Sequence, residues 1–302
     1  MTRVVFLLVP GLHLLDLAGP AQVFSTAAGL GLRYELCFIG EQEDIASAQG
    51  LPLRAATTWP SLCSDDLILV PGWRGPTLAK SPPLSQEAAT RLRKHHDAGG
   101  TVASVCSGAE ALGRAGLLDG RRCTTHHDLQ DELAQRYRHA TVVRDVLYVV
   151  DERVVTSAGI ASGIDLALHL IATRHGPGPA ARIAREMVVF ARRNGEESQD
   201  STMLRFRSHL SDVVHHAQDF LDARFTERLA LAELASHCRV SDRTLTRAFT
   251  QATGLTPLRY QQLLRVERAE HLIGHGATVE AAARSVGFSD ARMLRRLRAR
   301  VA

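Results

Sequence analysis

The chain has 302 residues, of which 45% are hydrophobic and 23% are charged, and its formal net charge is +4. This length exceeds what one compact core ordinarily holds, and the composition is that of a soluble globular protein, which excludes a disordered chain. The early apolar run 4–9 ends at Pro10 and is too short for a signal peptide or a membrane span. We therefore expect a cytoplasmic protein that makes no membrane contact.

Five cysteines are scattered along the chain, and no two of them form a Cys-x-x-Cys pair. An odd number without such pairs indicates neither a disulfide framework nor a structural zinc site. We expect no cofactor and no metal, so that any functional cysteine acts as a thiol.

The positive charge is confined to the last third of the chain. Residues 1–208 hold 22 basic and 22 acidic side chains, whereas residues 209–302 hold 14 arginines and 10 acidic side chains. The last dozen residues contain no acid, and their arginines are Arg292, Arg295, Arg296, Arg298 and Arg300. In a helix these arginines would face a polyanion, although a solvated basic tail has the same composition.

The first part of the chain alternates β-branched segments with amphipathic ones. The expected strands are 3–9, 34–39, 67–70, 101–105, 146–150 and 154–157. The expected helices are 20–30, 85–98, 109–115, 129–136 and 163–172. This alternation is typical of a parallel sheet between helical layers, and the two strands near residue 150 add a small antiparallel feature. We predict an α/β domain, a flavodoxin-like parallel-sheet sandwich, over residues 1–190.

A polar stretch without periodicity, 192–201, then predicts a linker, which we place at residues 191–208. Beyond it no strand pattern occurs, and residues 209–302 predict an all-α domain. Glycine and proline divide its helices at Gly254, Pro257, Gly274, Gly276 and Gly287.

The segment 229–251 predicts a helix-turn-helix unit. Ser241 follows an apolar helix and a short turn, and it is a suitable N-cap for a second helix. Leu245 and Phe249 lie four residues apart and should face the core. The residues expected to contact DNA are Ser241, Arg243, Thr244, Thr246 and Arg247. Arginine can bind guanine edges through two hydrogen bonds, and threonine can contact thymine methyl groups or phosphates.

The same arrangement recurs about 48 residues later, in 277–302. Ser289 or Asp290 would cap a helix whose expected DNA contacts are Arg292, Arg295 and Arg296. The long helix predicted over 257–272 joins the two units, so that their recognition helices could enter successive major grooves roughly 34 Å apart. Purely structural helical bundles also contain single helix-turn-helix patterns, but a repeat favours DNA binding.

Residues of both units resemble the DNA-binding domain of the AraC family, over about 85 to 95 residues. The matching positions are Ala230 to Leu234, Val240, Ser241, Leu245, Phe249, Thr253, Gly254, Pro257 and Val286 to Ser289. The family usually has an aromatic residue near the end of the second recognition helix, where this chain has Arg298. We therefore expect the second unit to pack less tightly or to contact mainly phosphates.

Cys106 is the strongest candidate for a reactive thiol in the first domain. It ends a predicted strand and precedes small residues and a helix, and Gly108 allows a tight turn there. A helix N-terminus favours the thiolate, so this position predicts a lowered cysteine pKa. An inert, buried structural cysteine is the alternative.

Several segments resemble the PfpI-like, class I glutamine amidotransferase-like domain, over roughly residues 3–190. They are 9–20, 101–118, 121–127 and 155–159, followed by Asp165. The resemblance implies that Asp16 lies beside Cys106, that Ser107 lines the same pocket, and that His126 is a neighbour. Some enzymes of the family have histidine where this chain has Ser107, so a nucleophile and base pair is not apparent. The pattern is nearer to the isonitrile hydratase branch.

Other histidines and one acid invite weaker interpretations. The pairs His95-His96 and His215-His216 lack further ligands, and neighbouring side chains on a helix diverge, so we expect surface residues and not metal sites. Asp165 begins a predicted helix, where an acid suits the helix dipole, and it also lies where it could reach a pocket.

The two resemblances together are typical of a transcription regulator that binds double-stranded DNA. We hypothesise that its first domain binds a small metabolite at Asp16, Cys106, Ser107 and His126 or forms a homodimer, and thereby controls DNA binding. The alternative is a hydratase-like or amidase-like enzyme that uses Cys106 and Asp16, with no firm catalytic set. A redox sensor at Cys106 is a third hypothesis.

Overall fold

The computed structural model describes residues 1–302 except 76, 79–83, 190–192, 198, 200–201, 275 and 300–302. Contacts divide the chain into two compact units, Met1–Gln199 and Asp200–Ala302, and each unit is described by itself. The predicted domain end at residue 190, residues 191, 192, 198, 200 and 201 of the predicted linker, and Arg300 lie outside the described residues. Within the described parts, no helix is both long enough and apolar enough to cross a membrane.

A six-stranded sheet forms the centre of the first unit, with the strand order β2-β1-β5-β6-β10-β9. Neighbouring strands run parallel except at one edge, where β9 pairs antiparallel with β10. The strands are β1 (Thr2–Leu8), β2 (Tyr34–Gly40), β5 (Leu67–Val70), β6 (Thr101–Val105), β9 (Tyr148–Asp151) and β10 (Val154–Ser157). The predicted α/β fold with a mainly parallel sheet is confirmed.

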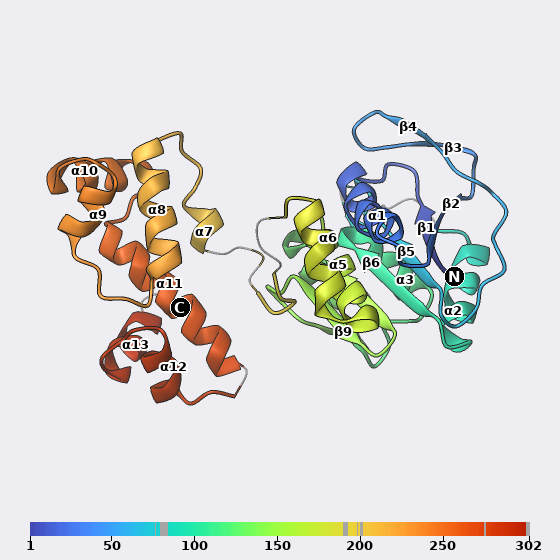
Figure 1. Ribbon diagram of the computed structural model, residues 1–302. Helices are drawn as coiled ribbons and strands as arrows, with labels where there is room; N and C mark the ends of the chain where they lie inside the picture. The colour runs from blue at the N-terminus through green and yellow to red at the C-terminus, as the bar shows by residue number, and fades with distance from the viewer. Residues whose placement is uncertain are drawn as a thin grey trace. The chain divides into compact units, whose positions relative to one another are not determined.

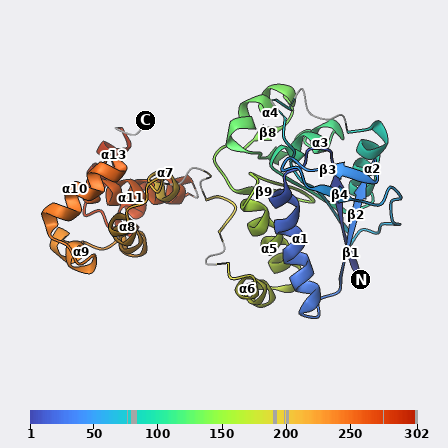
Figure 2. The ribbon, with the colours of Figure 1, turned by 90° about the horizontal axis from the view of Figure 1, so that it is seen from above.

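Helices cover both faces of this sheet, as Figures 1 and 2 show. One layer consists of α1 (Leu14–Gly29), α5 (Ser162–His175) and α6 (Pro177–Glu186), and the other of α2 (Gln86–Asp97), α3 (Ala109–Arg114) and α4 (Gln130–Arg136). Side chains alternate along each strand, so Phe6 packs into the first layer and Leu7 into the second. Both faces are buried, which is why the strands are continuously apolar.

Helix α1 begins earlier than the sequence predicts. The expected start was residue 20, but the helix begins at Leu14 and contains Pro20. Gly19 lets α1 approach α5, because a Cβ atom there would lie 3.0 Å from the Ile164 side chain. The early start matters for function because it places Asp16 in the first turn of the helix.

Some short elements were not predicted, because two or three residues carry no periodic pattern. They are β3 (Asp44–Ala46), β4 (Pro52–Arg54), β7 (Arg122–Cys123), β8 (Thr141–Val142) and the 3-10 helices η2 (Cys106–Gly108) and η3 (His127–Leu129). The expectation of surface histidines is wrong for His95 and His96, which are 6% and 7% exposed. The His95 ring fits there because Gly100 has no side chain, and its Nε2 atom lies 3.0 Å from the carbonyl oxygen of Asp66.

Two helical clusters share one long helix in the second unit. The first cluster joins α8, α9 and α10 to the start of α11, and the second joins α12 and α13 to its end. The helices are α7 (Thr202–Arg205), α8 (Asp212–Arg224), α9 (Leu231–His237), α10 (Asp242–Thr253), α11 (Pro257–Gly274), α12 (Val279–Ser285) and α13 (Ala291–Arg298). The predicted pair of helix-turn-helix units joined by a long helix is confirmed.

Arg265 of α11 fixes the second helix-turn-helix to the rest of the unit. Its guanidinium donates hydrogen bonds to three carbonyl oxygens, those of Phe225 at 2.6 Å, Gly287 at 2.8 Å and Glu227 at 2.7 Å. Gly287 lies at φ +85°, and a Cβ atom on it would overlap the carbonyl oxygen of Thr226. The turn before α13 therefore requires glycine.

Candidate DNA interface and effector pocket

Cys106 lies at a sharp turn between β6 and α3. Its φ angle is +56°, a conformation that few residues other than glycine adopt, and the residue is 7% exposed. The turn is possible because Gly108 has no side chain, since a Cβ atom there would overlap the carbonyl oxygen of Val70. The backbone thus presents the thiol at the carboxyl end of the sheet, where parallel α/β proteins bind ligands.

Asp16 faces this thiol from the first turn of α1. One of its carboxylate oxygens accepts a hydrogen bond from the backbone of Ile160 at 2.8 Å, and the other accepts one from Gly72 at 3.2 Å. The Cys106 thiol also hydrogen-bonds to this carboxylate. Gly72 and Gly159 leave the room for this contact, because a Cβ atom on either would overlap the Cys106 side chain.

The electrostatics of the pair correct the expected thiolate. Burial, and after it the negative charge of Asp16, raises the pKa of the Cys106 thiol to about 12. The hydrogen bonds from Ser107 oppose this shift but are weaker. The expectation of a lowered cysteine pKa is therefore wrong, since desolvation and a neighbouring anion outweigh the helix N-terminus. At neutral pH the thiol keeps its proton and donates a hydrogen bond to the Asp16 carboxylate.

Ser107 is buried beside the thiol, but its hydroxyl is occupied. The Oγ atom donates to the backbone carbonyl of Trp73 at 3.0 Å and accepts from the Trp73 backbone N–H at 2.8 Å. The hydroxyl thus connects the loop after β5 to the turn that carries Cys106. Ser107 thus lies next to Cys106, as the chain requires, and its side chain holds the loop after β5 in place.

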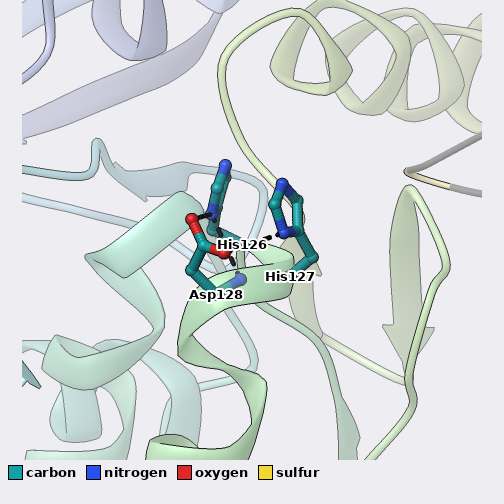
Figure 3. Close-up of side chains that lie close together, drawn as sticks. All are labelled: His126, His127 and Asp128. Carbon is teal, nitrogen blue, oxygen red and sulfur yellow. Dashed lines mark hydrogen bonds and ion pairs between the residues drawn. The ribbon is translucent and has the colours of Figure 1, made fainter. Parts of the chain in front are cut away.

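His126 lies near the Cys106 turn, because it follows Thr125, which contacts that turn directly. The hydroxyl of Thr125 donates to the carbonyl oxygen of Cys106 at 2.8 Å. The His126 ring itself stacks on His127 and faces Asp128 (Figure 3). Burial, and then the neighbouring His127, lowers the pKa of His126. The hydrogen bonds of the described residues thus connect His126 to Cys106 only through Thr125.

Asp165 does not line this site. It lies in the first turn of α5, and both of its oxygens accept hydrogen bonds from Arg193, at 2.9 Å from the backbone and at 2.9 and 2.6 Å from the guanidinium. Its role is to hold the chain segment that leaves the first unit.

Helix α10 presents the predicted recognition surface. Ser241 caps the helix, accepting a hydrogen bond from the Thr244 backbone N–H at 3.2 Å, and the two hydroxyls lie 2.8 Å apart. Leu245 and Phe249 are fully buried. The outer face borders an open hollow of about 810 Å³, lined by Leu231, Asp242, Arg243, Thr246, Arg247, Thr250 and Gln251. The helix therefore offers cationic and hydroxyl groups on one side and packs through the other.

Helix α13 has fewer available arginines than the sequence suggested. Its N-cap is Asp290, which accepts from the Arg292 backbone N–H at 2.8 Å. Arg295 forms an ion pair with Glu280, and Arg298 forms one with Glu270. The side chain of Arg292 is 89% exposed and lies 3.7 Å from the Asp290 carboxylate, and that of Arg296 is also exposed and contacts the sulfur of Met293.

Some residues of both surfaces were missed by the sequence analysis. Thr250 and Gln251 share the outer face of α10 because they follow Thr246 and Arg247 by four residues, a spacing that could have identified them. Gly72 of the first unit had no local pattern that marked it, and Thr125 lies in the matching segment 121–127 but was not singled out there. They reach Cys106 only through the fold.

Comparison with known proteins agrees with this architecture. Residues 2–173 match the DJ-1/PfpI family, and residues 234–301 match a helix-turn-helix domain. The HTH-type transcriptional regulator GbdR of Pseudomonas aeruginosa is 29% identical over 275 residues, which are 89% of this chain and 72% of GbdR. An isonitrile hydratase of Pseudomonas putida is 35% identical over 170 residues, which are 55% of this chain and 68% of that enzyme.

A solved structure resembles the first unit in fold. The crystal structure of an AraC family transcriptional regulator from Pseudomonas putida superposes with a TM-score of 0.53 at 22% identity, covering 62% of this chain and 100% of that one. Two family models match this chain, and GbdR is similar to it over most of both lengths. The geometry of α10 and α13 agrees with these matches. The chain belongs to the DJ-1/PfpI family and, through its helix-turn-helix domain, is a DNA-binding transcription regulator of the AraC type.

Proposed function

We propose that α10 reads base edges in the major groove and that α13 adds contacts mainly to phosphates. The arrangement of α10 carries this proposal. Arg243 and Arg247 are exposed on one face of the helix, whereas Leu245 is fully buried on the other. Both side chains border the open hollow beside α10 and are exposed, so both guanidiniums can reach guanine.

A mobility-shift assay on DNA flanking the protein's own gene tests this assignment. Arg247→Ala should weaken binding by about 1–3 kcal/mol and relax specificity at one base position. Arg33→Ala is the matched control, because it removes an exposed arginine from the first unit. Affinity that is unchanged by Arg247→Ala, or lowered equally by Arg33→Ala, would contradict base reading by α10.

The same proposal assigns a small metabolite to the site around Cys106. Asp16 and Cys106 form a buried acceptor and donor pair, and Gly72 and Gly159 bring the walls close, which favours a small ligand with a polar end. Metabolites handled by the products of neighbouring genes are the first compounds to test in thermal shift. Cys106→Ser should abolish a true shift, while Cys63→Ser, at an exposed cysteine, should preserve it.

The segment that leaves the first unit supports coupling between this site and DNA binding. Arg193 binds Asp165, and the side-chain amide of Gln199 donates to the carbonyl oxygens of Thr125 at 3.1 Å and Val146 at 2.8 Å. Thr125 in turn donates to Cys106. We call the described residues 193–197 and 199 the strap. A ligand that displaces Thr125 would loosen the strap, and the chain of the strap continues into the second unit.

Homodimer formation through the first unit belongs to the same proposal. Large apolar side chains are exposed around the start of α1 and beside the carboxylate of Asp16, namely Leu15 at 46%, Leu51 at 52% and Ile160 at 46%. Light scattering on the full chain measures its mass directly. Leu15→Asp should convert a dimer into a monomer, and a wild-type protein of monomer mass would overturn this part of the proposal.

Cysteine-dependent hydration is the second candidate function. The likeness to an isonitrile hydratase and the contact between Cys106 and Asp16 favour it, since Asp16 is placed to accept the thiol proton during attack on a carbon atom. Turnover of an isonitrile by wild-type protein that disappears in both Cys106→Ser and Asp16→Asn would support it. Normal DNA regulation by Cys106→Ser would show that catalysis is not required for control.

A further inference from the structure

Two histidines and an aspartate meet at the start of η3, in an arrangement that the sequence does not predict. Neighbouring side chains on a helix point about 100° apart, but His126 precedes the helix and has extended backbone angles, φ −54° and ψ 140°. Its ring therefore stacks on that of His127, with centroids 4.1 Å apart and planes inclined by 32° (Figure 3). The change of backbone conformation at the cap brings the two imidazoles together.

The carboxylate of Asp128 completes the group. Its two oxygens lie 3.1 Å from Nδ1 of His127 and 3.5 Å from Nδ1 of His126. One ligand atom from each of the three residues lies within 4.8 Å of the other two. Among the described residues, this is the only group of three or more histidines, cysteines or acids with such spacing.

The chemistry of these groups suits a transition metal. Two imidazole nitrogens and one carboxylate oxygen are ligands for Zn²⁺, Ni²⁺, Co²⁺ and Cu²⁺, whereas Mg²⁺ and Ca²⁺ prefer oxygen alone. The side chains of His127 and Asp128 are 54% and 74% exposed, so an ion can enter from solvent.

We propose that His126, His127 and Asp128 bind one divalent transition-metal ion at the rim of the Cys106 site. Three protein ligands leave a coordination position for water or for a donor atom of a small molecule. The position follows from the chain, because Thr125 precedes His126 and donates to the carbonyl oxygen of Cys106. The inference does not rest on the proposed effector, since the ion itself is the ligand measured.

Isothermal titration of Zn²⁺ and Ni²⁺ into chelator-treated full-length protein tests the proposal. We expect one ion per chain, and an affinity that falls at least about tenfold in His126→Ala and in His127→Ala, because each removes one ligand. Asp128→Asn should also weaken binding. A Cys63→Ser background prevents the exposed thiol of Cys63 from contributing.

Two controls separate this site from ordinary surface histidines. His139→Ala and His216→Ala remove exposed histidines elsewhere and should leave the affinity unchanged. The Co²⁺ complex should lack a thiolate charge-transfer band, because Cys106 is outside the ligand set. Wild-type protein that binds no Zn²⁺ or Ni²⁺, or a His126→Ala, His127→Ala double variant that binds as tightly as wild type, would overturn the proposal. Neither measurement contains DNA, so failure here leaves the DNA-binding proposal intact.

Discussion

At the scale of single residues, burial and mutual contact set the pKa values of Asp16 and Cys106. The carboxylate is fully buried, and burial raises its pKa despite the hydrogen bonds that it accepts. Its charge in turn raises the pKa of the thiol. A protonated thiol is a weak nucleophile and oxidises slowly. The geometry therefore favours a binding role over a redox sensor.

Alkylation of Cys106 by iodoacetamide should follow this assignment. With a thiol pKa of about 12, the rate should rise about tenfold per pH unit and reach no plateau between about pH 7 and pH 10. Asp16→Asn removes the neighbouring anion, so the thiol pKa should fall and alkylation at neutral pH should accelerate. Mass spectrometry follows alkylation of the wild type and of the variant, and exposed Cys63 serves as an internal standard. A plateau near neutral pH in the wild type would contradict the buried, protonated thiol.

At the scale of elements, the turn between α12 and α13 depends on one glycine. Gly287 and Gly276 have similar positive φ angles, +85° and +89°, but only Gly287 faces a backbone oxygen within contact distance. Alanine at a positive φ costs about 1–2 kcal/mol. Overlap with the carbonyl oxygen of Thr226 should add to this cost at Gly287.

Gly287→Ala should therefore lower the free energy of unfolding of the second unit by about 3 kcal/mol or more, and Gly276→Ala by about 1–2 kcal/mol. Urea unfolding followed by circular dichroism measures both. The difference between the two variants isolates the contact with Thr226, because the backbone cost is shared. Equal losses would show that the turn relaxes without strain.

The arginines of α13 should differ according to their partners. Arg296→Ala should weaken DNA binding uniformly across sequences and reduce the slope of log affinity against log salt by about 1, as loss of a phosphate contact does. Arg295→Ala should have a smaller effect, because Glu280 already neutralises that guanidinium. Titrations at several salt concentrations measure both slopes. A larger change for Arg295 than for Arg296 would contradict this assignment.

At the scale of the whole molecule, the strap leads from the first unit into the second. Its ion pair joins Arg193, 33% exposed, to Asp165, whose side chain is 4% exposed. Burial raises the pKa of Asp165, while the contacts with Arg193 oppose the rise. Removing Arg193 would leave a buried carboxylate without its cation.

Arg193→Ala should accordingly destabilise the first unit in a pH-dependent manner. The folded-state pKa of Asp165 would rise further above its unfolded value, so stability would be close to wild type near about pH 4 and would be lost as pH increases through the folded pKa. At about pH 7 we expect a loss of about 1–3 kcal/mol in urea unfolding, less than for a fully buried pair. Arg193→Ala with Asp165→Asn should recover part of this loss. A constant loss at every pH would point to packing and not to charge.

The local sequence of this protein determined its two kinds of architecture. Alternating β-branched and amphipathic segments predicted the parallel α/β sheet, and the spacing of Ser241, Leu245 and Phe249 predicted the cap and the buried face of α10. These features depend on residues within one or two turns, which is why the sequence reveals them. The expectation that Asp16 lies beside Cys106 came from the resemblance to a known family and not from the spacing of residues.

Only the tertiary structure decided the state of the functional groups. The raised pKa of Cys106, the occupied hydroxyl of Ser107 and the ion pair of Arg295 with Glu280 all arise between segments distant in sequence. Burial removes water from charged groups, and hydrogen-bond and ion-pair partners determine which side chains remain available. Neither the burial of a side chain nor its partner in a distant segment can be recognised from a periodic pattern in the sequence. The sequence therefore indicated candidate residues for each site, and the fold determined which of their polar groups are already engaged by other residues.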